Sequence, residues 1–262
     1  MNSSLGMLHT YDIADGVRAF STTRHGGMEA APAYSAFNIN PFCGDSAEHV
    51  AACREALCRE LGVGDDRLLL PHQTHGVESR VIGPEFCALP PQVRRMALDG
   101  VDAVMTAERN LCIGVSTADC IPVLLYDPAH HAVCAVHAGW RGTLARIARK
   151  AVAGMSAAFG TRPSELKAVI GPGISLEHFE VGDEVYGQFA AAGFDLSAAS
   201  SRRVKWHLDL PAINRRTLVE AGLDEAAIAM SGICTYAACD DFFSARRLGI
   251  GSGRIFNGIM LV

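Results

Sequence analysis

Apolar residues along the chain gather in short blocks separated by polar turns, a pattern typical of many short strands combined with helices. We predict strands at residues 17–23, 68–70, 77–81, 100–106, 111–115, 121–126, 132–136, 166–170, 226–233 and 255–262. Strands and helices are mixed without strict alternation. This order favours an α+β fold over a doubly wound parallel sheet.

Helical spacing of apolar residues is clearest between Ser46, which can cap the first N–H groups, and Gly62, which can end a helix in the left-handed conformation. An alanine-rich segment, residues 143–159, predicts a second helix that follows a Gly-Trp-Arg-Gly turn directly. Shorter helices are expected from residue 180 and over residues 210–218. The 262 residues, 49% of them hydrophobic, suit one compact domain covering residues 1–262.

Composition and charge limit the classes of function. No apolar run approaches the roughly 20 residues that span a bilayer, and the first ten residues lack the pattern of a secretion signal, so we expect a cytoplasmic protein without membrane contact. The net charge of −5 and the dispersed arginines argue against nucleic acid as a partner. The nine cysteines are scattered, and several lie in apolar stretches, as reduced core cysteines do.

Two of the apolar runs, residues 121–126 and 132–136, lie on either side of a turn at Asp127. Cys120 precedes the first run and His137 follows the second. If the runs pair as an antiparallel hairpin, these two side chains lie close together at the end away from the turn. A thiolate beside an imidazole is part of a zinc site or a Cys/His nucleophile pair.

A further candidate ligand, His75, lies in the turn of residues 71–76, where a side chain next to glycine is exposed at a strand end. One cysteine and two histidines can bind zinc and leave the fourth tetrahedral position open, as catalytic zinc sites do. His75, Cys120 and His137 are therefore a candidate catalytic zinc site. The alternative is that the histidines of this turn bind no ligand.

Other positions could bind an anion. Arg24-His25-Gly26-Gly27 follows the first strand, and its two glycines either bring backbone N–H groups close to an anion or make a plain turn. Arg141, at the start of the alanine-rich helix, would form a positive corner beside His137, or else a structural salt bridge.

Two heptads, Thr-Ala-Asp-Cys-Ile-Pro-Val at 117–123 and Val-His-Ala-Gly-Trp-Arg-Gly at 136–142, resemble the signature of the YfiH family. This family is also called the laccase-domain, polyphenol oxidase or peptidoglycan-editing-factor family. Further matches lie at residues 20–27, 37–40, 44–45, 73–76, 170–174, 180–182, 208–210 and 242–247. The resemblance implies an α+β fold with a mixed multistranded sheet or sandwich flanked by helices, and zinc ligands at His75, Cys120 and His137.

The resemblance also implies purine nucleoside chemistry. The reactions are phosphorolysis of adenosine, inosine, guanosine and methylthioadenosine, and hydrolytic deamination of adenosine. The expected partners are a purine nucleoside and phosphate. The candidate residues for catalysis are Cys120, His137 and Asp119, and those for binding substrate or phosphate are Arg24, His25, Asn38, Arg141 and Arg246. Asp119 or His25 could move protons.

Three other interpretations stay open. With Cys120 as nucleophile and His137 as base, the chain would be an amidase-type hydrolase of cell-wall precursors. The laccase name implies copper-dependent phenol oxidation, although the dispersed histidines do not suggest a site for several coppers. A fourth protein ligand, His72 or Asp119, would close the site and make it a structural zinc site. The sequence leaves the oligomeric state open.

Overall fold

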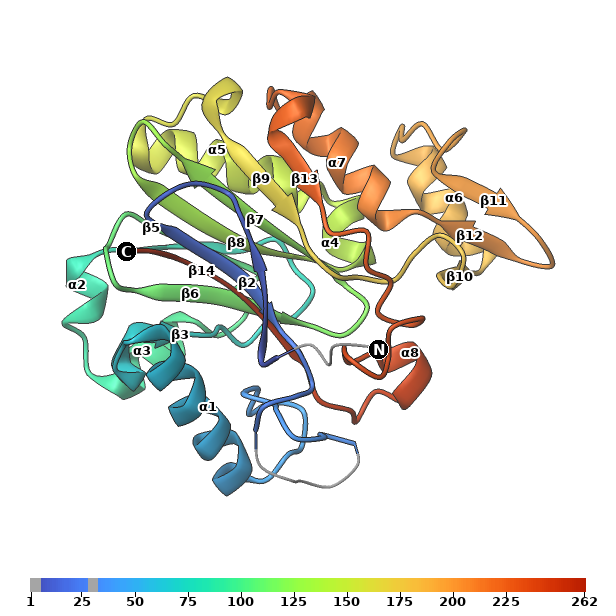
Figure 1. Cartoon of the computed structure of the whole chain (residues 1–262). Coiled ribbons are helices and arrows are strands. Elements are labelled where there is room, and N and C mark those ends of the chain that lie inside the picture. The colour runs from blue at the N-terminus through green and yellow to red at the C-terminus, as the bar shows by residue number, and fades with distance from the viewer. Residues whose placement is uncertain (1–5, 28–32) are drawn as a thin grey trace.

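Two β-sheets packed face to face form the centre of the computed structural model, which describes residues 6–27 and 33–262 (Figure 1). The strands of the first sheet are Leu8–Tyr11 (β1), Val17–Thr22 (β2), Leu68–Leu69 (β3), Cys112–Thr117 (β6) and Ile255–Leu261 (β14). Those of the second are Ser79–Ile82 (β4), Ala103–Thr106 (β5), Ile121–Asp127 (β7), Ala132–Ala138 (β8), Lys167–Ile170 (β9) and Ile228–Met230 (β13). Their orders are β1-β2-β14-β6-β3 and β13-β9-β7-β8-β5-β4, and both sheets contain parallel and antiparallel pairs.

Helices cover the outer face of each sheet, which explains why the central strands are continuous apolar runs. In β8, Val133 and Ala135 pack into the core between the sheets, whereas Cys134 and Val136 pack beneath helices on the other face. Those helices are Ile147–Phe159 (α5) and Leu210–Glu220 (α7). Ala47–Leu61 (α1) covers the first sheet. A strand buried on both faces has no polar side to show in the sequence.

The remaining elements are short. The other helices are Pro84–Cys87 (α2), Pro91–Ala97 (α3), Trp140–Leu144 (α4), Asp183–Ala191 (α6) and Ala245–Leu248 (α8). A small third sheet contains Glu180–Val181 (β10), Ser200–Arg202 (β11) and Trp206–Leu208 (β12). Within the described residues, no helix is long and apolar enough to cross a membrane. The α+β class is confirmed, while the domain span of 1–262 stays a prediction.

The predicted hairpin is confirmed. Strands β7 and β8 pair antiparallel, with Pro122 opposite His137 and Ile121 opposite Ala138. At the turn, the carboxylate of Asp127 accepts hydrogen bonds from the backbone N–H groups of the residues that follow it. Cys120 directly precedes β7, so the pairing brings it to the same end of the hairpin as His137.

The helix predicted over residues 143–159 is wrong in its continuity. The segment forms α4 and α5, separated at Arg146, which has a left-handed backbone with a φ of 59°. The Arg146 guanidinium lies 4.0 Å from the ring centre of Phe194 and contacts Glu220. These tertiary contacts stabilise the interruption between α4 and α5. Neither residue between the two helices is a glycine or a proline that would indicate the interruption in the sequence. Helix α1 has the predicted ends, with the Ser46 hydroxyl accepting from a backbone N–H.

Candidate metal centre

Three side chains from separate segments converge at one end of the β7–β8 hairpin. His75 lies in the loop between β3 and β4, Cys120 directly precedes β7, and His137 lies near the end of β8. One ligand atom from each residue lies within 4.8 Å of the other two. In a zinc tetrahedron with metal–ligand distances of about 2.0–2.3 Å, the ligand atoms would be roughly 3.3–3.8 Å apart. Small shifts of the side chains would therefore complete the geometry.

The carboxylate of Asp102 connects two of these three segments. Its carboxylate lies 2.7 Å from Nδ1 of His137, which leaves Nε2 of that ring facing the other two ligands. The same carboxylate accepts hydrogen bonds from the backbone N–H groups of Thr74, His75 and Gly76. A carboxylate behind a metal-binding histidine sets its tautomer and orientation. The sequence analysis missed Asp102, because a single buried aspartate at a strand start carries no signal of its own.

The protonation of Cys120 is coupled to its two histidine neighbours. Burial by itself would raise the pKa of the Cys120 thiol, but the charge and hydrogen bonds of His137 and His75 outweigh it and lower the pKa to about 6. Burial would lower the pKa of His137, but Cys120 and Asp102 raise it above its usual value. The site therefore favours a thiolate, which is the form that binds a metal.

Gly139 leaves the space that the ligands occupy. A Cβ at this position would lie 3.0 Å from Cδ2 of His75, 3.1 Å from Sγ of Cys120 and 3.7 Å from Cε1 of His137. Its φ of −65° is accessible to any residue, so the requirement for glycine comes from this close approach rather than from backbone strain.

The three side chains line a cavity of about 240 Å³. The other lining residues are Asn40, Phe42, Cys43, His72, Gln73, Ser116, Thr117, Ala118, Ala245, Ile250 and Arg254. At its mouth, Phe42 is 52% exposed and Ile250 is 85% exposed. A larger cavity of about 630 Å³, lined in part by Arg203 and Cys234, contains none of the three candidate ligands. The smaller cavity is therefore the one that contains the three candidate ligands.

The comparisons with known proteins identify the family of the chain. The family described as "Multi-copper polyphenol oxidoreductase laccase" matches residues 18–262. The chain belongs to this family. The matched residues include His75, Cys120 and His137. The resemblance to the YfiH family noted in the sequence is also confirmed.

Two relatives have names that concern purine nucleosides. A protein of Bacteroides thetaiotaomicron named purine nucleoside phosphorylase is 44% identical over 245 residues. The aligned region covers 92% of this chain and 90% of that protein. A protein from an unknown prokaryotic organism named adenosine deaminase RL5 is 44% identical over 248 residues, covering 94% of each. Among solved structures, the hypothetical protein YfiH of Bacillus licheniformis superposes with a TM-score of 0.91 at 27% identity, covering 98% of this chain and 97% of its own.

Asp119 lies beside Cys120, but its described contacts hold other segments in place. Its backbone has a left-handed φ of 83°. Its carboxylate accepts hydrogen bonds of 2.7 Å from the Thr235 hydroxyl and from the backbone N–H of Arg246 at the start of α8. This member of the laccase family therefore uses Asp119 to attach α8 to the hairpin end. Its expected catalytic role stays a prediction.

The other expected substrate residues lie outside the described lining of the metal cavity. Arg24 donates hydrogen bonds to Ser35 and to a backbone carbonyl, and its guanidinium lies over the Phe243 ring. His25 contacts Asp241 at 2.8 Å. The Arg246 guanidinium donates to the Glu180 carbonyl. Arg141 is exposed, with its guanidinium 4.2 Å from the ring centre of Trp140.

Asn38 and His72 are the two remaining candidates from the sequence. Asn38 is fully buried in a network of hydrogen bonds, whereas its neighbour Asn40 reaches the cavity. His72 lines the cavity but contacts Asp99 at 2.7 Å and is not part of the three-ligand cluster. The cavity residues that the sequence analysis missed include Phe42 and Arg254, which come from segments without a recognisable metal or phosphate motif.

Proposed function

We propose that the chain is a zinc-dependent purine nucleoside enzyme. The proposed reactions are phosphorolysis of adenosine, inosine, guanosine and methylthioadenosine, and hydrolytic deamination of adenosine. The observation that carries the proposal is the cluster of His75, Cys120 and His137 within 4.8 Å in an open cavity. The names of two relatives at 44% identity support the purine substrates.

The donor set suits zinc better than several coppers. Thiolate and imidazole ligands bind zinc in tetrahedral geometry, and three protein ligands leave a position for substrate or water. Within the described residues, His75, Cys120 and His137 form the one cluster of at least three potential ligands. Several coppers would require additional histidine clusters. Neither His72 nor Asp119 belongs to this cluster, which favours an open site over a closed structural one.

The chain's own residues would prepare the site for both reactions. Asp102 orients the His137 ring, and Gly139 leaves space for the thiolate and the two rings. A bound zinc would supply Lewis-acid chemistry for a substrate oxygen or for water. The cavity is smaller than the roughly 300–1,000 Å³ usual for small-molecule sites. A nucleoside would therefore extend past Phe42 and Ile250 at the mouth.

The direct test combines metal analysis with product analysis. Protein of known metal content is incubated with adenosine, with and without phosphate, and the products are separated by chromatography. We expect adenine that depends on phosphate, inosine that does not, and loss of zinc and of both products in His75→Ala, Cys120→Ala and His137→Ala. A fully zinc-loaded protein that turns over no purine nucleoside would refute the proposal.

The Cys/His amidase is the second candidate, and the approach of His137 to a thiol with a lowered pKa favours it. It would act on cell-wall precursors, with Cys120 attacking a carbonyl. Substitution of Cys120 abolishes activity under both mechanisms. A covalent intermediate trapped on Cys120 supports the amidase, whereas zinc-dependent activity without such an intermediate supports the metal enzyme.

A further inference from the structure

Arg254, in the loop before β14, is the one arginine or lysine among the described residues that line the metal cavity. No aspartate or glutamate appears in that described lining. None of the ion pairs found among the described residues includes Arg254. The cavity therefore has a cationic side chain whose charge is not neutralised by a carboxylate of the described chain.

Hydrogen bonds hold the guanidinium of Arg254 in place, but not all of its N–H donors have an acceptor among the described residues. Nη1 donates to the carbonyls of Ser252 and Gly253, and Nη2 donates to the carbonyl of Ile250 at 2.7 Å. A guanidinium has five N–H groups. Nε and one N–H of Nη2 have no acceptor among the described residues. Nε and Nη2 lie along one edge of the planar group, so this edge offers at least the Nε–H to an oxygen of a phosphate.

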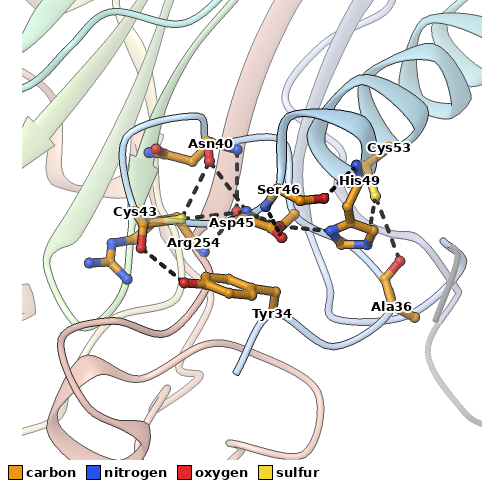
Figure 2. Close-up of polar contacts among 10 residues, drawn as sticks. Tyr34, Ala36, Asn40, Cys43, Asp45, Ser46, His49, Cys53 and Arg254 are labelled. Carbon is orange, nitrogen blue, oxygen red and sulfur yellow. Dashed lines mark hydrogen bonds and ion pairs between the residues drawn. The ribbon is translucent and has the colours of Figure 1, made fainter. Parts of the chain in front are cut away.

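Hydrogen bonds through the buried side chain of Asn38 fix the backbone from which the Arg254 side chain extends. The backbone N–H of Arg254 donates to Oδ1 of Asn38 at 3.1 Å, and Nδ2 of Asn38 donates to Asp45 at 2.8 Å. The same oxygen of Asp45 lies 2.7 Å from Nδ1 of His49. In Figure 2 the Arg254 guanidinium extends away from this Asp45–His49 pair. Asn38, expected from the sequence to bind substrate, therefore acts as a positioning residue for Arg254.

We propose that Arg254 binds the phosphate co-substrate in the metal cavity. The inference rests on the proposed function, because phosphorolysis requires phosphate and deamination does not. In phosphorolysis, a phosphate oxygen forms a bond to ribose C1′ while the bond from C1′ to the purine nitrogen breaks. The electron pair leaves with the purine, which takes up a proton from solvent. An arginine that holds the attacking phosphate serves this reaction and has no part in replacing an amino group with water.

The test uses zinc-loaded protein, inorganic phosphate and two substitutions at position 254. Arg254→Gln removes the charge but keeps a donor for the loop carbonyls, and Arg254→Lys keeps the charge but loses the planar fork. Arg149→Gln is the matched control, because Arg149 is an exposed arginine of α5 outside the described cavity lining. Phosphate affinity is measured by calorimetry, and the phosphate dependence of adenine release and the phosphate-free release of inosine are measured beside it.

We expect the phosphate Kd, and the KM for phosphate, to rise roughly 10- to 100-fold in Arg254→Gln, as for a lost hydrogen bond to a charged group. Arg254→Lys should show a smaller rise, and Arg149→Gln no change. Zinc content and melting temperature should stay at the wild-type level in all three variants, which shows that the metal site and the fold are intact. Arg254→Gln should lose far more phosphorolysis than deamination.

Three results would overturn the assignment. They are an unchanged phosphate Kd in Arg254→Gln, equal losses of phosphorolysis and deamination, and a wild-type protein that binds no phosphate. Absence of phosphorolysis in a wild-type protein that does bind phosphate would instead count against the proposed function. In that case the Kd of Arg254→Gln still decides whether Arg254 is the phosphate ligand.

Discussion

Replacing Gly139 by alanine tests whether the three side chains around it are metal ligands. The added methyl group would lie 3.0 Å from Cδ2 of His75 and 3.1 Å from Sγ of Cys120, closer than ordinary van der Waals contact. Both side chains would have to move by a few tenths of an ångström. Metal–ligand distances tolerate about 0.2 Å. The substitution therefore displaces two of the three ligands by more than this tolerance, which weakens metal binding.

We expect the zinc affinity of Gly139→Ala to fall roughly 10- to 100-fold, the usual effect of disturbing the support of metal ligands. This corresponds to about 1.4–2.8 kcal/mol of binding free energy. A competing chromophoric chelator gives the affinity, and a melting curve of the metal-free protein gives the stability. The backbone at this position accepts alanine, so the metal-free protein should keep its fold.

Gly187→Ala is the matched control. Gly187 lies within α6, and no atom lies within 4 Å of the position of an added Cβ. Alanine there should leave zinc affinity unchanged and stabilise the protein by up to about 1 kcal/mol. If Gly139→Ala binds zinc as tightly as the wild type and the control do, the proposed packing of ligands around Gly139 is wrong.

Three further outcomes follow from the contacts of single side chains. Asp102→Asn should lower zinc affinity about 10- to 100-fold in the same chelator assay, because the amide no longer fixes His137 as a carboxylate does. In metal-free protein, iodoacetamide should modify Cys120 at neutral pH. Because its pKa is lowered to about 6, the thiolate is present above that pH and is lost below it, so modification should slow as pH falls and stop when zinc is added. Asp127→Ala should lower the free energy of unfolding by about 1–3 kcal/mol in urea, since its buried carboxylate accepts from the Thr161 hydroxyl and from backbone N–H groups at the hairpin turn.

The same Asp127 contacts predict a pH dependence of stability. Burial would raise the pKa of Asp127, but the hydrogen bonds from Thr161 and the neighbouring groups outweigh it and lower the pKa. A lowered pKa means that the contribution is present above the unfolded-state pKa and is lost as pH falls through the folded-state pKa. The difference in unfolding free energy between wild type and Asp127→Ala should therefore shrink in acid.

Local features of the sequence determined much of the fold. The pairing of β7 with β8 follows from two apolar runs around a turn, and both ends of α1 follow from Ser46 and Gly62. This pairing also brings Cys120 and His137 together, so two of the three candidate ligands could be placed from the sequence pattern. His75 is a candidate from its place in the turn before Gly76, and the family resemblance implies the same ligand. Such features depend on residues that are close in the chain, or on side-chain types suited to a metal.

Tertiary structure decided the surroundings of these ligands. Asp102 contacts His137 across 35 positions of sequence, and the Arg254 backbone contacts Asn38 across 216. The break at Arg146 likewise depends on contacts with distant residues. The sequence shows which side chains are suited to bind a metal or an anion. Only the packing of the two sheets and their loops decides which of them share a cavity, because the pairing of distant segments depends on the whole core.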